Sequence, residues 1–214
     1  MKKNKGFYKI FLTVMLMMTV IFSGNSYLVN VQAADTAVLK SEKNRIYVYE
    51  NGKKVSNAWR TIGKYKYYFG KDGVAYRSSK SEGTHSICIK KIKGKYYAFD
   101  IKGHMVTGPR VGHISDMTPP QIYYFSPKTG AYDKKVTARY RTAARPSTMK
   151  KINSTTAIRK LLGKPKKTWV SKKIGSCFLD GNGRDGELIY DHLIVNIFIP
   201  AGSNKEYVES VIMR

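Results

Sequence analysis

The chain has 214 residues, with 39 lysines and arginines against 14 aspartates and glutamates, which gives a formal charge of +25. A charge this large favours polyanionic partners and says nothing about the fold. The longest apolar run, residues 10–22, is shorter than the roughly 20 residues that span a bilayer, so a multi-spanning membrane protein is excluded. Length alone allows one large domain or two small ones.

Residues 1–33 have the layout of a secretory signal peptide. A lysine-rich start is followed by the apolar run and then by Val31-Gln32-Ala33, with small or apolar residues at both key positions before a cut. We expect cleavage after Ala33; the alternative is an uncleaved membrane anchor. The mature protein would be secreted, would lack a transmembrane segment and would attach to the cell non-covalently.

Cleavage removes four lysines and no acid, leaving 35 basic against 14 acidic residues and a formal charge of +21. For an exported protein the nearest polyanions are cell-wall polymers and membrane phosphates, and we expect no specific nucleic-acid partner. The alternative is a solvated basic surface with no specific partner.

A polar lead-in, residues 34–44, is followed by a repeated pattern over residues 45–135. Each copy has a short aromatic run, a few polar residues and a glycine, and the closing glycines lie 21, 30 and 27 residues apart. The copies are Ile46–Gly52, Tyr67–Gly73, Tyr97–Gly103 and Tyr123–Gly130. A period in this range is typical of stacked supersecondary units.

Each copy predicts a β-hairpin. Tyrosine and phenylalanine favour half-buried strands, and Asn51-Gly52 and Asp72-Gly73 are strong hairpin-turn signals. Gly63-Lys64 and Gly94-Lys95 mark the opposite turns. Because an isolated hairpin is marginally stable in water, neighbouring hairpins must stack to bury their rings. The predicted fold class is mainly β, a solenoid-like hairpin module followed by a smaller α+β part.

The segment Ile92–Asp100, followed by Gly103–Gly108, resembles the repeat of the choline-binding and glucan-binding cell-wall modules. The resemblance covers about residues 45–135. It implies a β-hairpin solenoid that holds surface proteins to teichoic acid, glucan or host glycans.

The resemblance also implies where a ligand would bind. The family usually has a Gly-Trp pair ahead of each unit, whereas here Trp59 alone keeps the tryptophan and Pro109 follows Gly108 at the equivalent point. We therefore expect at most one aromatic cage for a quaternary ammonium, built from Trp59, Tyr68 and Tyr97. Stacking of sugar rings on tyrosine faces demands less and fits better. The candidate ligand-binding residues are Trp59, Tyr67, Tyr68 and Tyr97, and the alternative for each ring is core packing.

Two stretches interrupt the repeat, and a basic segment follows it. The stretches Lys80–Ile87 and Arg110–Gln121 interrupt the array. After it, residues 136–152 combine Pro146 with several arginines and lysines, and we interpret them as a basic linker. The alternative for this segment is an arm that binds an anionic polymer.

Residues 153–214 change character and predict a small α+β domain. Asn153-Ser154 can cap a helix that ends at Gly163, and apolar runs separated by turns predict antiparallel strands after it. The segment Ile158–Pro165, Ser176-Cys177 and Tyr190 resemble small secreted domains of the β-lactamase-inhibitor-protein type. That resemblance implies protein binding.

No catalytic motif is visible, so the sequence predicts neither an enzyme nor a metal or other cofactor. Asp180–Asp185 suggests a calcium loop but lacks the remaining ligands, and a turn explains it better. Cys88 and Cys177 could pair, because export permits disulfides, or could stay unpaired. The predicted function is attachment to cell-wall polysaccharide or teichoic acid through the aromatic hairpins. The alternative is a protein-interaction or inhibitor role of residues 153–214, with another surface protein as partner.

Overall fold

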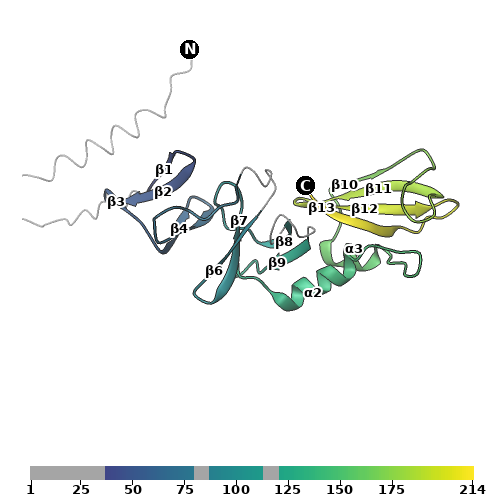
Figure 1. Cartoon of the computed structure of the whole chain (residues 1–214), viewed down its shortest axis with the longest axis horizontal. Coiled ribbons are helices and arrows are strands. Elements are labelled where there is room, and N and C mark those ends of the chain that lie inside the picture. The colour runs from purple at the N-terminus through teal and green to yellow at the C-terminus, as the bar shows by residue number, and fades with distance from the viewer. Residues whose placement is uncertain (1–36, 80–86, 113–120) are drawn as a thin grey trace, which may run out of the picture. The chain divides into compact units, whose positions relative to one another are not determined.

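The computed structural model describes residues 37–79, 87–112 and 121–214 (Figure 1). The predicted signal peptide and most of the two predicted interruptions lie outside these residues. Within them, no helix combines the length and apolarity needed to cross a membrane.

The first half of the described chain consists of antiparallel hairpins, as the repeats predict. A three-stranded sheet of order β1-β2-β3 comes first, and three two-stranded hairpins follow. The strands are β1 Val38–Glu42, β2 Arg45–Glu50, β3 Lys53–Lys54, β4 Ala58–Ile62, β5 Tyr65–Phe69, β6 Cys88–Ile92, β7 Lys95–Phe99, β8 Gly108–Gly112 and β9 Gln121–Phe125. The prediction of a mainly β fold is confirmed.

Tight two-residue turns set the register of several of these hairpins. Lys93 and Gly94 join β6 to β7 with φ of 46° and 82°, and Asn51 and Gly52 join β2 to β3 with φ of 50° and 75°. Positive φ at both central residues matches the right-handed twist of the flanking strands. The four glycines that close the repeats, at positions 52, 73, 103 and 130, all have positive φ.

Each hairpin is joined to the preceding one by the same backbone contact. After β5, β7 and β9 the chain turns and forms a bridge back onto the last residue of that strand. The bridging residue then donates its N–H to the second residue of β2, β5 or β7. These bonds are Ala75 to Ile46, Met105 to Lys66 and Tyr132 to Tyr96, with N···O distances of 2.8, 2.7 and 2.8 Å. This regular pairing makes the hairpins a repeat array.

The core of the array is a series of small clusters. Phe69, Phe99 and Phe125 occupy the last position of β5, β7 and β9, and each is completely buried. Phe69 packs with Val48 and Tyr67, whereas Phe99 packs with Tyr68. Each hairpin therefore stabilises its neighbours through a phenylalanine at one fixed position of the repeat.

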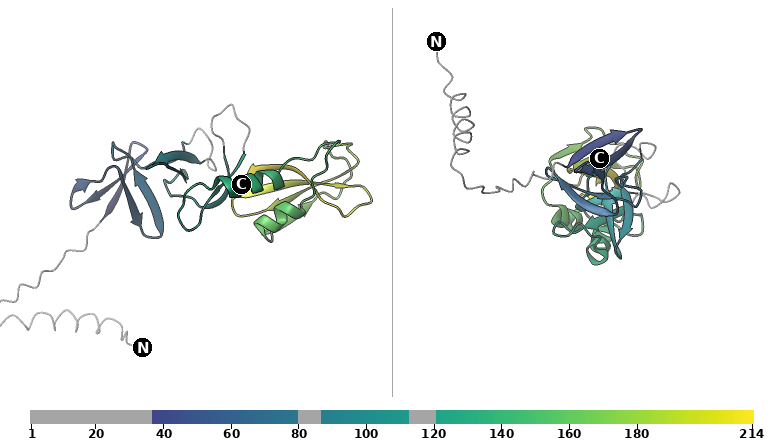
Figure 2. Two further views of the ribbon diagram at one scale, coloured as in Figure 1. Left: turned by 90° about the horizontal axis from the view of Figure 1, so that it is seen from below. Right: turned by 90° about the vertical axis from the view of Figure 1, so that its left-hand side faces the viewer.

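The C-terminal part is an α+β layer. Its sheet is an antiparallel meander of order β10-β11-β12-β13 (Figure 2). Helix α3 shares a core cluster with this sheet, and helix α2 packs on β9 and on α3. The elements are α2 Lys134–Ala143, α3 Thr156–Leu162, β10 Lys167–Val170, β11 Gly183–Ile189, β12 Leu193–Pro200 and β13 Tyr207–Met213. Helix α3 ends at Gly163, as the sequence predicts, but the predicted Asn153-Ser154 cap is wrong, because the N-cap is Thr155 and no side chain caps it. Residues 175–179 form no strand.

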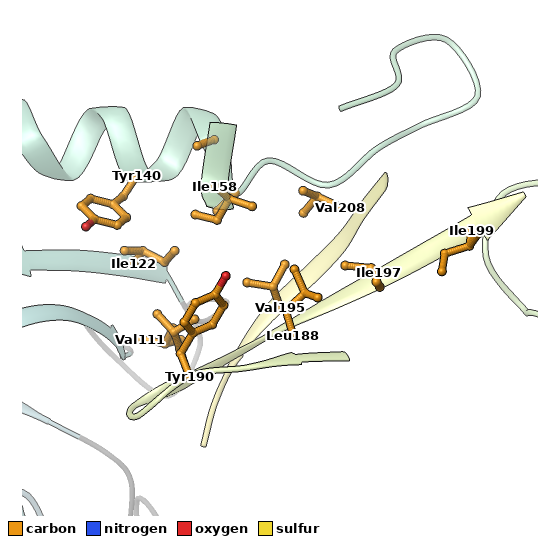
Figure 3. Packing of buried hydrophobic residues seen from close by; sticks show 13 residues of the cluster. Val111, Ile122, Tyr140, Ile158, Leu188, Tyr190, Val195, Ile197, Ile199 and Val208 are labelled. Atoms are coloured by element: carbon orange, nitrogen blue, oxygen red, sulfur yellow. The ribbon is translucent and has the colours of Figure 1, made fainter. Parts of the chain in front are cut away.

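The largest apolar cluster joins this layer to the last hairpin. Val111 and Ile122 of β8 and β9 lie in one cluster with Ile158 of α3 and with Leu188 and Val195 of the sheet (Figure 3). Strand β8 also contacts β13. The last hairpin therefore shares its core with the C-terminal layer.

The predicted linker 136–152 is wrong in its first half, because α2 runs from Lys134 to Ala143. Asp133 caps this helix by accepting a hydrogen bond from the Val136 N–H. Tyr140 and Ala143 are buried in the largest apolar cluster, where the Tyr140 ring stacks on Tyr124 of β9. Apolar residues at helical spacing were present, but the dense positive charge masked them.

Two further expectations differ from the structure. Residues 38–42 of the predicted polar lead-in form β1, which pairs with all but the last residue of β2 although each of its side chains is exposed. This strand is held by backbone pairing across the Lys43-Asn44 turn and not by buried side chains. Its sequence therefore has no alternation of apolar and polar residues from which a strand could be predicted. Cys88 in β6 and the exposed Cys177 are not joined by a disulfide.

Candidate functional site

The predicted aromatic trio comes together from two consecutive hairpins. Trp59 of β4 pairs with Tyr68 of β5, and their ring centroids lie 5.1 Å apart at an edge-on angle of 68°. Tyr97 of β7 meets the same indole ring at 4.9 Å and 69°. Phe99 stacks against the indole at 5.8 Å. Trp59 is therefore the meeting point of the rings of both hairpins.

The members of this cluster differ in accessibility. Phe99 and Tyr68 are buried, at 0% and 5% exposure, whereas Trp59 and Tyr97 are half-buried. The Tyr68 hydroxyl donates a 2.6 Å hydrogen bond to Asn57 Oδ1. Burial, followed by the nearby Tyr76, raises the pKa of Tyr68, so its hydroxyl stays protonated and can donate. Tyr68 packs against Trp59 on the buried side of the cluster, whereas Trp59 and Tyr97 present the accessible surface of the site.

Tyr67 lies elsewhere. Adjacent residues of a strand point to opposite faces, so Tyr67 and Tyr68 cannot serve one site. Tyr67 is 5% exposed and packs with Phe69 of its own strand and with Ile46 and Val48 of β2, and its ring meets His104 edge-on at 5.3 Å. Burial, followed by Asp100 and Tyr65, raises its pKa. Its place is that of a core residue between hairpins.

Lys66 is a part of the cluster that the sequence reading missed. Its Nζ lies 4.9 Å from the Trp59 ring centroid, and its side chain is exposed. Lys66 is two residues from Tyr68, so both side chains share a face of β5. An ammonium over an indole face is attracted by the ring quadrupole. The alternation of lysine and tyrosine in β5 is the signal that could have identified this contact.

Lysine over an aromatic face recurs along the hairpins. Four further lysines place Nζ between 5.0 and 5.7 Å from a tyrosine centroid on the same sheet or hairpin. The pairs are Lys40 with Tyr49, Lys54 with Tyr47, Lys64 with Tyr65 and Lys91 with Tyr96. Cations and rings thus share the accessible faces of the array, which suits a ligand with both hydroxyl and apolar surfaces.

The arrangement around Trp59 can bind a ligand in two ways. The accessible parts of Trp59 and Tyr97 can stack on the apolar face of a sugar ring, while Lys66 donates hydrogen bonds to its oxygens. Alternatively, a ligand cation can replace the Lys66 ammonium. In the described residues, no group of three His, Cys, Asp or Glu side chains is placed to hold a metal ion.

Comparison with known proteins finds no matching family model and no matching curated protein. Solved structures do match, at low similarity. The endolysin of phage Cp-1 complexed with choline is 16% identical over 79% of this chain and 36% of that chain, with a TM-score of 0.36. Choline binding protein F of Streptococcus pneumoniae is 16% identical over 80% of this chain and 47% of that one, with a TM-score of 0.33.

Enzymes also occur among the matched structures. Truncated alternansucrase of Leuconostoc mesenteroides is 17% identical over 83% of this chain and 13% of that chain, with a TM-score of 0.33. The prediction that the chain is not an enzyme is contradicted, because alternansucrase and the endolysin are both enzymes. The chain spans about a third of the length of the endolysin. The resemblance of residues 153–214 to β-lactamase-inhibitor-type domains stays a prediction.

Proposed function

We propose that this chain is an exported binding protein that attaches non-covalently to cell-wall polysaccharide or teichoic acid through its hairpin array. The binding site is the accessible surface of Trp59 and Tyr97, with Lys66 beside it. One observation carries the proposal: these two rings come from consecutive hairpins, their centroids lie 4.9 Å apart, and both stay half-buried over a buried phenylalanine.

Physical chemistry supports a ligand at this place. Aromatic side chains bury 150–250 Å² each when fully covered, in rough terms, so a ring left half-open keeps much apolar area in water. A stacked sugar would remove part of that area. Exposed lysines of the array, such as Lys64 and Lys95, would add long-range attraction to an anionic wall.

Lys66 favours a glycan over choline at this site. A quaternary ammonium would have to displace the Lys66 ammonium from the Trp59 face, whereas a glycan can stack on Tyr97 and accept hydrogen bonds from Lys66. We therefore expect weak choline binding that strengthens in Lys66→Gln, because this substitution removes the competing cation.

Replacement of Trp59 tests the proposal. Trp59→Ala should lower retention on purified cell walls by about tenfold or more. It should lower the affinity for isomaltotriose or choline, measured by titration calorimetry, by the same factor. The reason is the loss of one stacking ring, which contributes roughly 1.4 kcal/mol. Trp169→Ala is the matched control, because Trp169 is the other tryptophan of the chain and is 48% exposed in β10. Equal retention of Trp59→Ala and wild type, with unchanged folding by circular dichroism, would refute the site.

A second candidate function is the binding of another surface protein by the C-terminal sheet. Ile189, Ile194 and Ile212 pair across β11, β12 and β13 in one row, and none belongs to the buried core cluster. Trp169 on the edge strand β10 is also exposed. Cross-linking of the wild-type chain and of an Ile212→Ser/Trp169→Ser variant to surface proteins tests this function, which predicts an adduct that the variant loses. Identical adducts from both chains would exclude it.

A further inference from the structure

Charge is distributed unevenly along the C-terminal part. Between Asp133 and Asp180 the sequence has no acidic residue, while lysines and arginines recur throughout this segment. Two of its cations are neutralised within the fold: Arg159 pairs with Glu206 and Lys166 pairs with Asp191. The remaining ones include Lys150, Lys151, Lys172 and Lys173, all exposed.

Two short turns in this segment present an aliphatic side chain beside two lysines. The first is Thr148–Lys151, closed by reciprocal backbone hydrogen bonds between Thr148 and Lys151 of 2.9 and 3.0 Å. This turn places Met149 and Lys150 at its tip. Met149 is 72% exposed, and Ile152 next to it is 46% exposed.

The second turn covers residues 171–175. The Ser171 N–H donates to the Asp185 carbonyl, and the Gly175 N–H donates to the Gly183 carbonyl, so both ends of the turn are fixed to β11. Between them Lys172 and Lys173 precede Ile174, which is 63% exposed. Met149 and Ile174 are the two most exposed large apolar side chains of the described residues.

Both turns lie at the same end of the C-terminal sheet. The first is held beside β13, because the Ser147 N–H donates to the Val208 carbonyl. The second leaves β10 next to Asp185, which pairs with Phe198, and Phe198 pairs with Tyr207 next to Val208. The sheet has the order β10-β11-β12-β13, so the first turn lies by the β13 edge and the second by β10 and β11, and the two turns flank the same end of the sheet. We call residues 148–152 and 172–174 the aliphatic tip.

We propose that the aliphatic tip binds the surface of an anionic lipid bilayer. Met149, Ile152 and Ile174 enter the boundary between headgroups and acyl chains, and the four lysines contact lipid phosphates. The four exposed lysines give the tip a positive charge that is complementary to an anionic surface. Exposed aliphatic side chains on hydrogen-bonded turns favour a bilayer over a soluble polyanion, because a polyanion in water gives them nothing apolar to enter.

The acidic side chains near the tip leave its charge positive. Glu206 accepts two hydrogen bonds from Arg159, each of 2.8 Å. Asp180 lies in the same loop as Ile174, and its carboxylate caps the Asn182 N–H. The lysines at positions 150, 151, 172 and 173 outnumber Asp180 and Asp185, so the field of the tip attracts phosphate.

Vesicle sedimentation tests this proposal with the mature chain, residues 34–214, which contains every described element. The chain should bind vesicles of phosphatidylcholine mixed with phosphatidylglycerol and should not bind pure phosphatidylcholine. Met149→Ser/Ile174→Ser should lower the partition coefficient about tenfold through lost apolar burial. Lys150→Gln/Lys151→Gln/Lys172→Gln/Lys173→Gln should lower it more than a hundredfold, at about fivefold for each lysine.

Matched controls separate the tip from general stickiness and net charge. Val38→Ser/Leu39→Ser removes two exposed aliphatic side chains of β1 and should leave binding unchanged. Lys53→Gln/Lys71→Gln/Lys95→Gln/Lys102→Gln removes the same charge from the hairpins and should weaken binding far less than the tip variant.

Three results would overturn the proposal. One is equal loss in the two lysine variants, which would assign binding to net charge. Another is unchanged vesicle binding of Met149→Ser/Ile174→Ser, together with binding of soluble poly(glycerol phosphate) that is lost in the four-lysine variant. This pair of results would make the tip a binding site for a polymer. The third is unchanged vesicle binding with a fall in molecular mass of the aliphatic variant in light scattering, which would make the tip a contact between copies.

Discussion

At the scale of single residues, position within a strand decides whether an aromatic ring stabilises the fold or stays accessible. Phe99 ends β7 and is fully buried, whereas Tyr96 in the same strand is 47% exposed. The two residues are three apart, so they point to opposite faces. Their substitutions should therefore have very different effects.

Phe99→Ala should destabilise the chain by about 3–5 kcal/mol, because it leaves a cavity beneath Trp59 and beside Tyr68. Tyr96→Ala in the same strand should cost less than about 1 kcal/mol. Urea denaturation followed by tryptophan fluorescence measures both values. Similar losses for the two variants would show that the rings on the two faces contribute equally.

Glu209 gives the C-terminal sheet a defined pH dependence. Burial, followed by the charge of Asp185, raises the pKa of Glu209, and Asp185 Oδ1 is buried without a hydrogen-bond partner among the described residues. As pH rises above about 4.5, the unfolded chain loses the Glu209 proton before the folded chain does. This carboxylate therefore lowers stability as pH rises through its folded pKa.

Glu209→Gln should accordingly stabilise the chain at pH 7.5, because the amide removes a carboxylate that burial and the charge of Asp185 disfavour. The gain should vanish near pH 4, where wild-type Glu209 is protonated. Thermal unfolding across this pH range measures it, with Glu187→Gln as a control in β11. A gain that is independent of pH would exclude charge as its cause.

At the scale of elements, helix α2 depends on its cap more than on its composition. It has no acidic residue in its first turn, and positively charged side chains crowd it. Asp133 provides both the hydrogen bond to the Val136 N–H and the negative charge that suits a helix N-terminus.

Asp133→Ala should cost about 1 kcal/mol, within the range for N-cap removal. Asp133→Ser should retain most of the hydrogen bond and lose only the charge contribution, so its cost should be smaller. Urea denaturation of both variants tests this order. Equal costs would mean that the charge alone stabilises α2.

Prediction from sequence worked where glycine or a local pattern fixed the backbone. The hairpins, their turns and helix α3 fall in this class. It failed for β1, whose side chains are all exposed, and for α2, whose charged surface masked Val136, Tyr140 and Ala143. Of the predicted site residues, strand alternation alone could have separated Tyr67 from Tyr68.

At the scale of the whole molecule, the last hairpin shares one core cluster with the array and another with the C-terminal layer. Val111 and Ile122 share a cluster with Leu188 and Val195. Arg110 of β8 lies near Asp100 and Asp191, and burial lowers its pKa to about 10 despite these two carboxylates. It remains charged at neutral pH and attracts carboxylates of both the array and the β11–β12 turn.

Hydrogen exchange measures this coupling. Leu188→Ala should lower the protection of amides in both β12 and β9 by the full loss in stability, about 2–5 kcal/mol. Amides of β2, whose core is Val48 with Phe69, should be affected much less. Loss of protection confined to β10–β13 would show that the last hairpin unfolds with the array instead.

The sequence by itself determined the repeat, the positions of its turns and the presence of one tryptophan in the array, because glycine-dependent turns and aromatic alternation are local properties. Only the tertiary structure decided which rings meet. Trp59, Tyr68 and Tyr97 converge because backbone bonds such as Met105 to Lys66 dock one hairpin on the next. Contacts between chain segments far apart in sequence leave no periodic trace, so the site and the shared C-terminal core appear only once the hairpins are stacked.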